Sequence, residues 1–340
     1  MWRDHGKVSA IDQKNELPEI KKAFPEFKQV GSQVLQDVIE RLDKAFQTFF
    51  RRVRERSGKV GYPRFKNVQA YNSFTLKQTG WCLDGKYLTI KNVGTFKLRL
   101  HRPIEGKIKT VTVRLAATGE WFACFSCDEV PEKLLPKTGK IIGIDFGLNH
   151  FAVDSDGKAW ENPRHLRNKE RYLKRVQRAL SRKQKGGKNR AKTRTKLAKA
   201  HQKVANQRRD FAHKFANYYI ERYDHIVFEN LNIRGMVRNK YLAKSISDAA
   251  WNISITIATY KAGSAGRLVE QVYAAGTSIL CSDCGQRVPK KLHERLHVCP
   301  ACGAIKCRDF NAALNIMARA MPFELNAPFV IGRAQEAQCF

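Results

Sequence analysis

The sequence predicts an α/β protein whose main sheet begins after about residue 140, preceded by a helical segment and a small antiparallel barrel or sheet. Apolar residues recur at three- and four-residue steps before residue 56, and short alternating runs follow from about 73 to 130. Beyond residue 140, strand-like runs alternate with helical patterns, which is typical of a mixed sheet covered by helices. A chain of 340 residues is long enough for two or three packed units.

The first element is an amphipathic helix between Glu16 and about Arg56. We interpret its apolar stripe as core, and Gly58, Gly61 and Pro63 end the pattern. The stripe consists of Val34, Leu35, Val38, Ile39, Leu42, Phe46, Phe49 and Phe50.

The next segment contains the runs SFTLKQTG, KYLTIKNVGTFKLRL, KTVTVRLAATG and EWFACFSCDEV, which predict antiparallel strands joined by tight turns. Cys124 and Cys127 lie in the last run with no second pair nearby. We therefore interpret them as small strand or core residues.

After a linker rich in Pro and Lys, the run KIIGIDFGLNHFAVDSDGKAWEN predicts a meander of three strands. Residues 163 to about 216 are predicted to be helical and strongly basic, with a break at the Gly pair 186–187. A strand at HIVFEN, a helix around SISDAAWNISITIATYKAG, a strand at GRLVEQVYA and a helix from Asp309 to about Ala320 complete the pattern.

Two Cys-x-x-Cys pairs, Cys281/Cys284 and Cys299/Cys302, have the spacing of a zinc ribbon. Gly285 and Gly303 directly follow the pairs and suit the left-handed turns of such knuckles. Pairing as disulfides is the alternative, but there is no signal peptide and no apolar stretch long enough to span a membrane. The spacing therefore predicts one structural Zn²⁺.

The charge balance indicates a partner with a dense negative backbone. The chain has 63 Lys and Arg against 31 Asp and Glu, a net charge of +32. Nucleic acid is the first candidate. An anionic membrane is the runner-up, but it would require an amphipathic helix with a bulky apolar face or a lipidation signal, and neither is found. We expect a cytoplasmic protein associated with the nucleoid of a prokaryote.

Three carboxylates lie where the predicted sheet could bring them together. Asp145 ends a strand between Gly143 and Gly147, which permit close approach of another backbone or a phosphate; Glu229 ends a second strand; Asp309 opens a helix. Three such acids can hold two Mg²⁺ ions for phosphodiester hydrolysis. Each acid alone has an ordinary alternative: a turn residue, a surface acid and a helix N-cap, respectively.

The motifs GIDFGLNHFAV, IVFENLNIRGM, SISDAAW, CSDCG, CPACG and RDFNAALNI occur in an order that resembles the transposon-encoded TnpB family, related to type V CRISPR effectors. The basic segment from NPRHLRNKERY to RRDFAHKFA lies between the first two of them, as in that family, and the likeness covers residues from about 16 to 320. It implies an RNA-guided DNA endonuclease whose cofactors are Zn²⁺, Mg²⁺ and a guide RNA and whose partners are that RNA and target DNA.

The resemblance also implies an RNase H-like (RuvC) core with an inserted zinc ribbon, preceded by a helical recognition segment and a wedge-like barrel. It divides the chain into 1–57 (recognition), 58–137 (wedge), 138–280 (core), 281–302 (ribbon), 303–322 (last core segment) and 323–340 (tail). It makes Asp145, Glu229 and Asp309 the catalytic Mg²⁺ ligands and Cys281, Cys284, Cys299 and Cys302 the zinc ligands. Nucleic-acid contacts are expected at Tyr62, Arg64, Phe65, Lys66, Arg167, Arg171, Lys174, Arg175, Arg178, Arg182, Lys183, Lys185, Arg208 and Arg209.

Two departures from that family are visible. The family begins with a strand and a helix that this chain is expected to lack, and Cys307 replaces the usual Asp before Arg308 and Asp309. The first departure keeps open a guide-dependent DNA binder that no longer cleaves, and a compact CRISPR effector is a further alternative. A strand transferase with a tyrosine nucleophile would need a His-hydrophobe-His motif, which the sequence lacks.

Overall fold

The computed structural model describes residues 9–56, 60–67, 70–291 and 293–320. It divides into two compact units, residues 1–131 and 132–340. The predicted tail, 323–340, lies outside the described residues.

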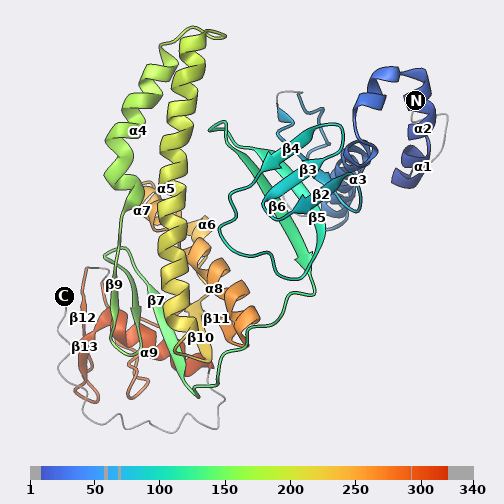
Figure 1. The fold of residues 1–340 in the computed structure, drawn as a ribbon. Helices are drawn as coiled ribbons and strands as arrows, with labels where there is room; N and C mark the ends of the chain where they lie inside the picture. The colour runs from blue at the N-terminus through green and yellow to red at the C-terminus, as the bar shows by residue number, and fades with distance from the viewer. Residues whose placement is uncertain (1–8, 57–59, 68–69, 292, 321–340) are drawn as a thin grey trace. The chain divides into compact units, whose positions relative to one another are not determined.

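The first unit begins with helices and continues as antiparallel strands (Figure 1). The strands form two separate three-stranded sheets, in the orders β1-β5-β6 and β2-β3-β4. Leu76, Leu88, Ile90 and Val111 form their core. The elements are α1 (Ala10–Asn15), α2 (Leu17–Ala23), η1 (Pro25–Gln29), α3 (Ser32–Arg54), β1 (Ser73–Leu76), β2 (Trp81–Asp84), β3 (Tyr87–Ile90), β4 (Gly94–Lys97), β5 (Lys107–Leu115) and β6 (Trp121–Asp128).

The predicted first helix is divided into shorter helices, and its apolar stripe is core only in part, with Val34 packed against the core of the first unit. Pro25 and Gly31 divide the segment, because proline lacks the N–H that a continuing helix needs. Within α3 only Asp37 is buried, whereas Leu42 and Phe50 are about half exposed. Polar groups also attach α3 to β1: Asp37 accepts a hydrogen bond from the Thr75 backbone N–H at 2.9 Å.

The second unit is built on a mixed five-stranded sheet in the order β11-β10-β7-β8-β9. Strand β10 is parallel to β7 and β11, and the predicted meander β7-β8-β9 is antiparallel. The elements are β7 (Ile141–Phe146), β8 (His150–Asp154), β9 (Ala159–Glu161), α4 (His165–Ser181), α5 (Lys188–Ile220), β10 (His225–Glu229), α6 (Ile233–Met236), α7 (Ala243–Ala249), α8 (Trp251–Ala265), β11 (Leu268–Val272), β12 (Leu296–Val298), β13 (Ile305–Cys307) and α9 (Arg308–Ala320).

Strand alternation gives the sheet two different faces. Ile142, Ile144 and Phe146 of β7 point into the large core, which also contains residues of α5 and α8. The residues between them face α9, where Val227 and Ile316 form a smaller cluster. One face therefore packs against the large core, and the other is covered by α9.

Helices α4 and α5 form a hairpin that extends beyond the sheet (Figure 1), with the predicted break between them at Gly186 and Gly187. At the base of the hairpin, the carboxylate of Asp248 in α7 accepts hydrogen bonds from the backbone N–H groups of Leu166 and Arg167 at 2.9 and 3.0 Å. Arg208 of α5 donates to the same carboxylate at 3.0 Å. Asp248 thus caps α4 and joins three helices.

Candidate functional site

The first candidate site lies on the α9 face of the sheet, where β7 and β10 end. Gly143 and Ile144 pair in parallel register with Val227 and Phe228, so Asp145 and Glu229 occupy the next equivalent positions on neighbouring strands. Side chains at equivalent positions of adjacent strands point to the same face. Their alternation with the core residues makes that face the one covered by α9.

Gly143 determines how closely α9 approaches. A Cβ at this position would lie 2.2 Å from the Ala313 carbonyl oxygen and 2.5 Å from the Met317 nitrogen, so only glycine fits. Asp309 precedes Ala313 by one helical turn, and Asp145 follows Gly143 by two strand residues. Because both steps cover about 6 Å, the contact at Gly143 brings Asp309 over Asp145. The predicted close approach of a backbone at Gly143 is confirmed.

The electrostatics agree with three acids in one place. Burial, together with the negative charges of Glu229 and Asp309, raises the pKa of Asp145 well above its ordinary value. Burial also raises the pKa of Glu229, whose side chain accepts a hydrogen bond from Thr277 and feels the charge of Arg319. Because these carboxylates repel one another, a bound cation would lower the electrostatic free energy of the cluster.

Cations border Asp309 on its other side. The Arg295 guanidinium lies 3.7 Å and the Arg308 Nε lies 3.4 Å from its carboxylate. The buried acid Asp154 is not part of this cluster: its carboxylate accepts a hydrogen bond from Tyr219 at 2.8 Å, and Tyr219 belongs to the large core on the opposite face.

The second candidate site is formed by the four predicted cysteines. Their Sγ atoms all lie within 4.8 Å of one another, with Cys281–Cys302 at 3.7 Å and Cys284–Cys299 at 3.5 Å. A tetrahedral zinc with bonds of about 2.3 Å separates its sulfurs by roughly 3.8 Å, so the donor set fits this ion. Across the part of the chain that the structure describes, this is the one group of three or more potential metal ligands within 4.8 Å; the three carboxylates are not such a group.

Each knuckle turns at its predicted glycine. Gly285 has φ +73° and donates its N–H to the Cys281 carbonyl, and Gly303 has φ +74° and donates to the Cys299 carbonyl. The backbone N–H of Cys302 is the largest of the influences that lower the pKa of Cys299 to about 6, whereas the pKa values of Cys284 and Cys302 are raised among the neighbouring thiols. Zinc binds the thiolate form, so binding would release protons from these cysteines.

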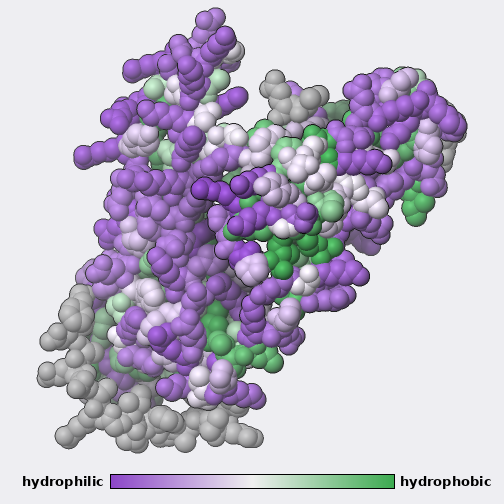
Figure 2. Space-filling view, in the orientation of Figure 1, coloured by the Kyte–Doolittle hydropathy of each residue, from purple (hydrophilic) through white to green (hydrophobic). Residues whose placement is uncertain are grey.

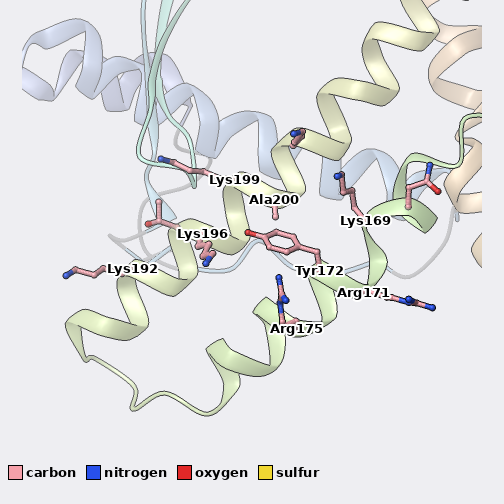
Figure 3. Close-up of a pocket in the computed structure, with 11 residues that line it drawn as sticks. Lys169, Arg171, Tyr172, Arg175, Lys192, Lys196, Lys199 and Ala200 are labelled. Carbon is pink, nitrogen blue, oxygen red and sulfur yellow. The ribbon is translucent and has the colours of Figure 1, made fainter.

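The third candidate site is a groove of about 990 Å³ between α4 and α5 (Figure 3). Tyr172 lies in the space between the helices, and Arg175 stacks 5.4 Å from the centre of its ring. Seven of its eleven lining residues are cationic and none is acidic. They are Asn168, Lys169, Arg171, Tyr172, Arg175, Lys192, Thr195, Lys196, Lys199, Ala200 and Lys203.

The acids of the hairpin do not neutralise this groove. Glu170 and Asp210 are the acids of α4 and α5, and each pairs with a lysine one turn away, Lys174 at 2.6 Å and Lys214 at 2.7 Å. The visible face of the hairpin is hydrophilic along most of its length (Figure 2). An anionic polymer is the ligand that this surface would bind.

The predicted nucleic-acid contacts lie in different surroundings. Arg171 and Arg175 line the groove, whereas Arg178, Arg182, Lys185 and Arg209 are exposed elsewhere on the hairpin and Lys183 is half-buried. Arg167 donates a hydrogen bond to Ser245, and Arg208 is engaged by Asp248. In the first unit Tyr62 packs against Phe46 and Phe49, Phe65 and Arg64 are exposed, and Lys66 lies 4.9 Å from the Tyr71 ring centre.

Sequence reasoning missed several groove residues, although a signal for them exists. Lys192, Lys196, Lys199 and Lys203 follow one another at four-, three- and four-residue steps, which places them on one helix face. Tyr172 occurs in the opposing helix. Asp248 was missed because its role depends on contacts distant in sequence.

Comparison with known proteins gives two family matches. Residues 125–240 match the OrfB_IS605 family, described as "Probable transposase", and residues 251–316 match the Cas12f1-like TNB domain. Two curated relatives are described as "Putative RNA-guided DNA endonuclease". One, from Streptomyces pristinaespiralis, is 32% identical over 94% of this chain and 80% of its own length; InsQ of Escherichia coli is 29% identical over 84% and 74%.

The fold resembles that of a solved Cas12f1 complex with sgRNA and target DNA. That match has a TM-score of 0.54 at 14% identity and covers 91% of this chain and 80% of the Cas12f1 chain. Within the described residues no helix is both long and apolar enough to cross a membrane.

Proposed function

The chain belongs to the family of RNA-guided DNA endonucleases, and from this premise we propose that it hydrolyses DNA phosphodiesters at the carboxylate cluster of Asp145, Glu229 and Asp309. The observation that carries the proposal is the convergence of these acids from two strand ends and a helix start onto one face of the sheet. A mixed sheet with its acids so arranged supports an RNase H-like core.

The donor set favours Mg²⁺. Carboxylate oxygens are the ligands this hard cation prefers, and burial together with the negative charges of Glu229 and Asp309 raises the pKa of Asp145, so a cation there would favour its charged form. When bound, Mg²⁺ supplies charge stabilisation and an activated water. The chain's own contribution is to hold the acids against their mutual repulsion, by the strand register on one side and by the contact of α9 with Gly143 on the other.

Arg295 and Arg308 border the site beside Asp309, where a scissile phosphate would also need positive charge. Their contacts with Asp309 are long, at 3.7 and 3.4 Å, so their guanidinium groups retain the capacity to donate to phosphate oxygens. We assign them to binding and orienting the DNA backbone.

The partners of the relatives are proposed for this chain as well: a guide RNA and a target DNA. The groove between α4 and α5 would hold phosphates of one strand, with the Tyr172 ring available to a base. The predicted contacts from Tyr62 to Lys66 would add to this in the first unit. Base pairing between the guide RNA and the target DNA would then supply most of the sequence specificity. Such partners would place the protein at the nucleoid.

The four cysteines are proposed to bind one structural Zn²⁺ within a ribbon inserted in the core. Their sulfur separations support this ion. The predicted segments, with recognition before residue 57, wedge to 137 and core from 138, are retained as a proposal on the same family premise.

The test is cleavage of a guide-matched DNA by the full chain with its guide RNA. Asp145→Ala and Asp309→Ala are each expected to abolish Mg²⁺-dependent cleavage and to leave RNA binding unchanged, because neither acid lies in the basic groove. Asp210→Ala, on the exposed face of α5, is the matched control and should cleave normally. Wild-type cleavage by Asp145→Ala would refute the assignment.

A further inference from the structure

Helix α9 carries a polar stripe beside the one that contacts the sheet. Asn311, Asn315 and Arg319 follow one another at four-residue steps and therefore share one side of the helix. All three donate hydrogen bonds to backbone carbonyls of the segment between β11 and the zinc knuckle, residues 273–280.

The bonds of Asn315 hold the centre of that segment. Its Nδ2 donates to the Thr277 carbonyl at 2.7 Å and to the Leu280 carbonyl at 2.8 Å, which uses both of its amide hydrogens. Arg319 holds the beginning of the segment through the carbonyls of Tyr273 and Ala275. The backbone of the segment is held by a turn at Gly276 and by pairing of Ile279 and Leu280 near the knuckle, so these side chains supply further fixed points.

Thr277 connects the segment that Asn315 holds to the acid cluster. Its residue is 3% exposed, and its hydroxyl donates to the Glu229 carboxylate and lies 3.1 Å from the Ala274 carbonyl. The position of the hydroxyl is set by the backbone whose carbonyl Asn315 holds. Glu229 is 6% exposed, so water cannot readily replace a missing partner.

Asn311 links the same stripe to the zinc knuckle. Its Nδ2 donates to the Leu280 carbonyl at 2.7 Å, and its Oδ1 accepts from the backbone N–H of Ser282 at 3.0 Å. Cys281 lies between these two residues. Asn311 is completely buried, and both of its polar atoms are satisfied on either side of the first zinc ligand.

We propose that Thr277 and Asn315 are positioning residues for Glu229, and that the stripe Asn311–Asn315–Arg319 makes the zinc knuckle part of the support of the cleavage site. This inference rests on the proposed function of the acid cluster. One helix thus provides Asp309, places it over the sheet and fixes the segment that orients Glu229. Partners of this kind set the orientation and metal affinity of a ligand.

The test compares Thr277→Val with Thr259→Val in the full, zinc-loaded chain. Thr259 is the matched control, since its hydroxyl donates to a backbone carbonyl of α8 at 2.9 Å, away from the acids. Two quantities are measured: the Mg²⁺ concentration that gives half-maximal cleavage with guide RNA, and Mn²⁺ binding to the protein without nucleic acid, read as free Mn²⁺ by electron paramagnetic resonance.

For Thr277→Val, both midpoints are expected to rise about 10- to 100-fold, with RNA affinity and the zinc content per chain unchanged. Thr277→Ser should restore both, because it keeps the hydroxyl. Asn315→Ala should shift the midpoints in the same direction, while Asn217→Ala, an amide on α5 that accepts from Lys261, should not.

The inference is overturned if Thr277→Val has the same Mg²⁺ and Mn²⁺ midpoints as Thr259→Val. It is also overturned if Thr277→Ser has midpoints as high as those of Thr277→Val. If Thr277→Val has a strongly lowered melting temperature, Asn315→Ala takes its place, and the same two midpoints decide. If Asp145→Ala cleaves normally, the proposed function itself fails. If Asp145→Ala is inactive but Thr277→Val behaves as wild type, only the positioning role fails.

Discussion

Gly143→Ala should distort the proposed cleavage site without replacing any of its three acids. The added Cβ would meet the Ala313 carbonyl oxygen at 2.2 Å, the Met317 nitrogen at 2.5 Å and the Met317 Cβ at 2.8 Å. Two of these are backbone atoms, which no side-chain rotation can remove. Ordinary contact begins near 3.4 Å, so α9 must shift by about 1.2 Å (3.4 − 2.2). Overpacking of this kind costs about 1–3 kcal/mol of unfolding free energy.

Because Asp309 belongs to α9, the same shift displaces one of the three carboxylates. A misplacement of about 1 Å reduces catalysis by roughly 10²-fold, so the single-turnover cleavage rate at saturating guide RNA should fall by about that factor. The melting temperature of the variant is measured beside it. RNA affinity should be unchanged, since neither Gly143 nor any residue of α9 lines the groove between α4 and α5.

Gly263→Ala is the matched control. Gly263 lies inside α8 with no heavy atom within 4 Å of an added Cβ, so alanine should stabilise the helix by about 0.5–1 kcal/mol and leave cleavage intact. A Gly143→Ala variant that melts and cleaves like Gly263→Ala would show that the position of α9 does not depend on this contact. It would refute the claim that the contact at Gly143 places Asp309 over Asp145.

Three further outcomes are expected. Cys302→Ser should bring the zinc content, measured by elemental analysis, from about one per chain to a small fraction and lower the melting temperature, since zinc binding contributes folding free energy; a full zinc content would contradict the site. Asp248→Asn should cost about 3 kcal/mol in chemical denaturation, because it weakens a buried charged contact with Arg208. Burial would raise the pKa of Asp248, but the N–H groups of Arg167 and Leu166 and the Arg208 guanidinium lower it. Its contribution is thus complete above about pH 4 and disappears as the pH falls further; equal stability of the variant at pH 7 would refute this. Lys196→Ala with Lys199→Ala should reduce the slope of log RNA affinity against log salt by about 0.7 for each phosphate that these lysines no longer neutralise, with Lys214→Ala as control; an unchanged slope would remove the groove from the RNA path.

Much of the second unit could be predicted because its signals are local. The apolar run before Asp145, the paired glycines at 186–187 and the start of a helix near Asp309 all correspond to observed elements. The cysteine pairs predicted their own cluster for the same reason, since tight turns bring each pair together.

The remainder depends on contacts between distant segments. The apolar stripe of α3 has a helical period, but a period gives no information about what covers the helix, and Leu42 and Phe50 are in fact half exposed. Asp248 lacks any local motif that would distinguish it from a surface acid. The three catalytic candidates converge only through strand register and the packing of α9, so the residues alone leave each of them with an ordinary alternative role, and only the order of motifs along the chain groups them.

Helix α9 is the last helix that the structure describes, and it supplies both the third acid and the cover of the acid-bearing face. During synthesis β7 and β10 leave the ribosome long before it. A nascent chain, or a product of proteolysis that ends in the zinc ribbon, therefore carries Asp145 and Glu229 without Asp309. Under the proposed function, such a chain lacks one of the three acids of the cleavage site and is expected not to cleave DNA until α9 has been synthesised.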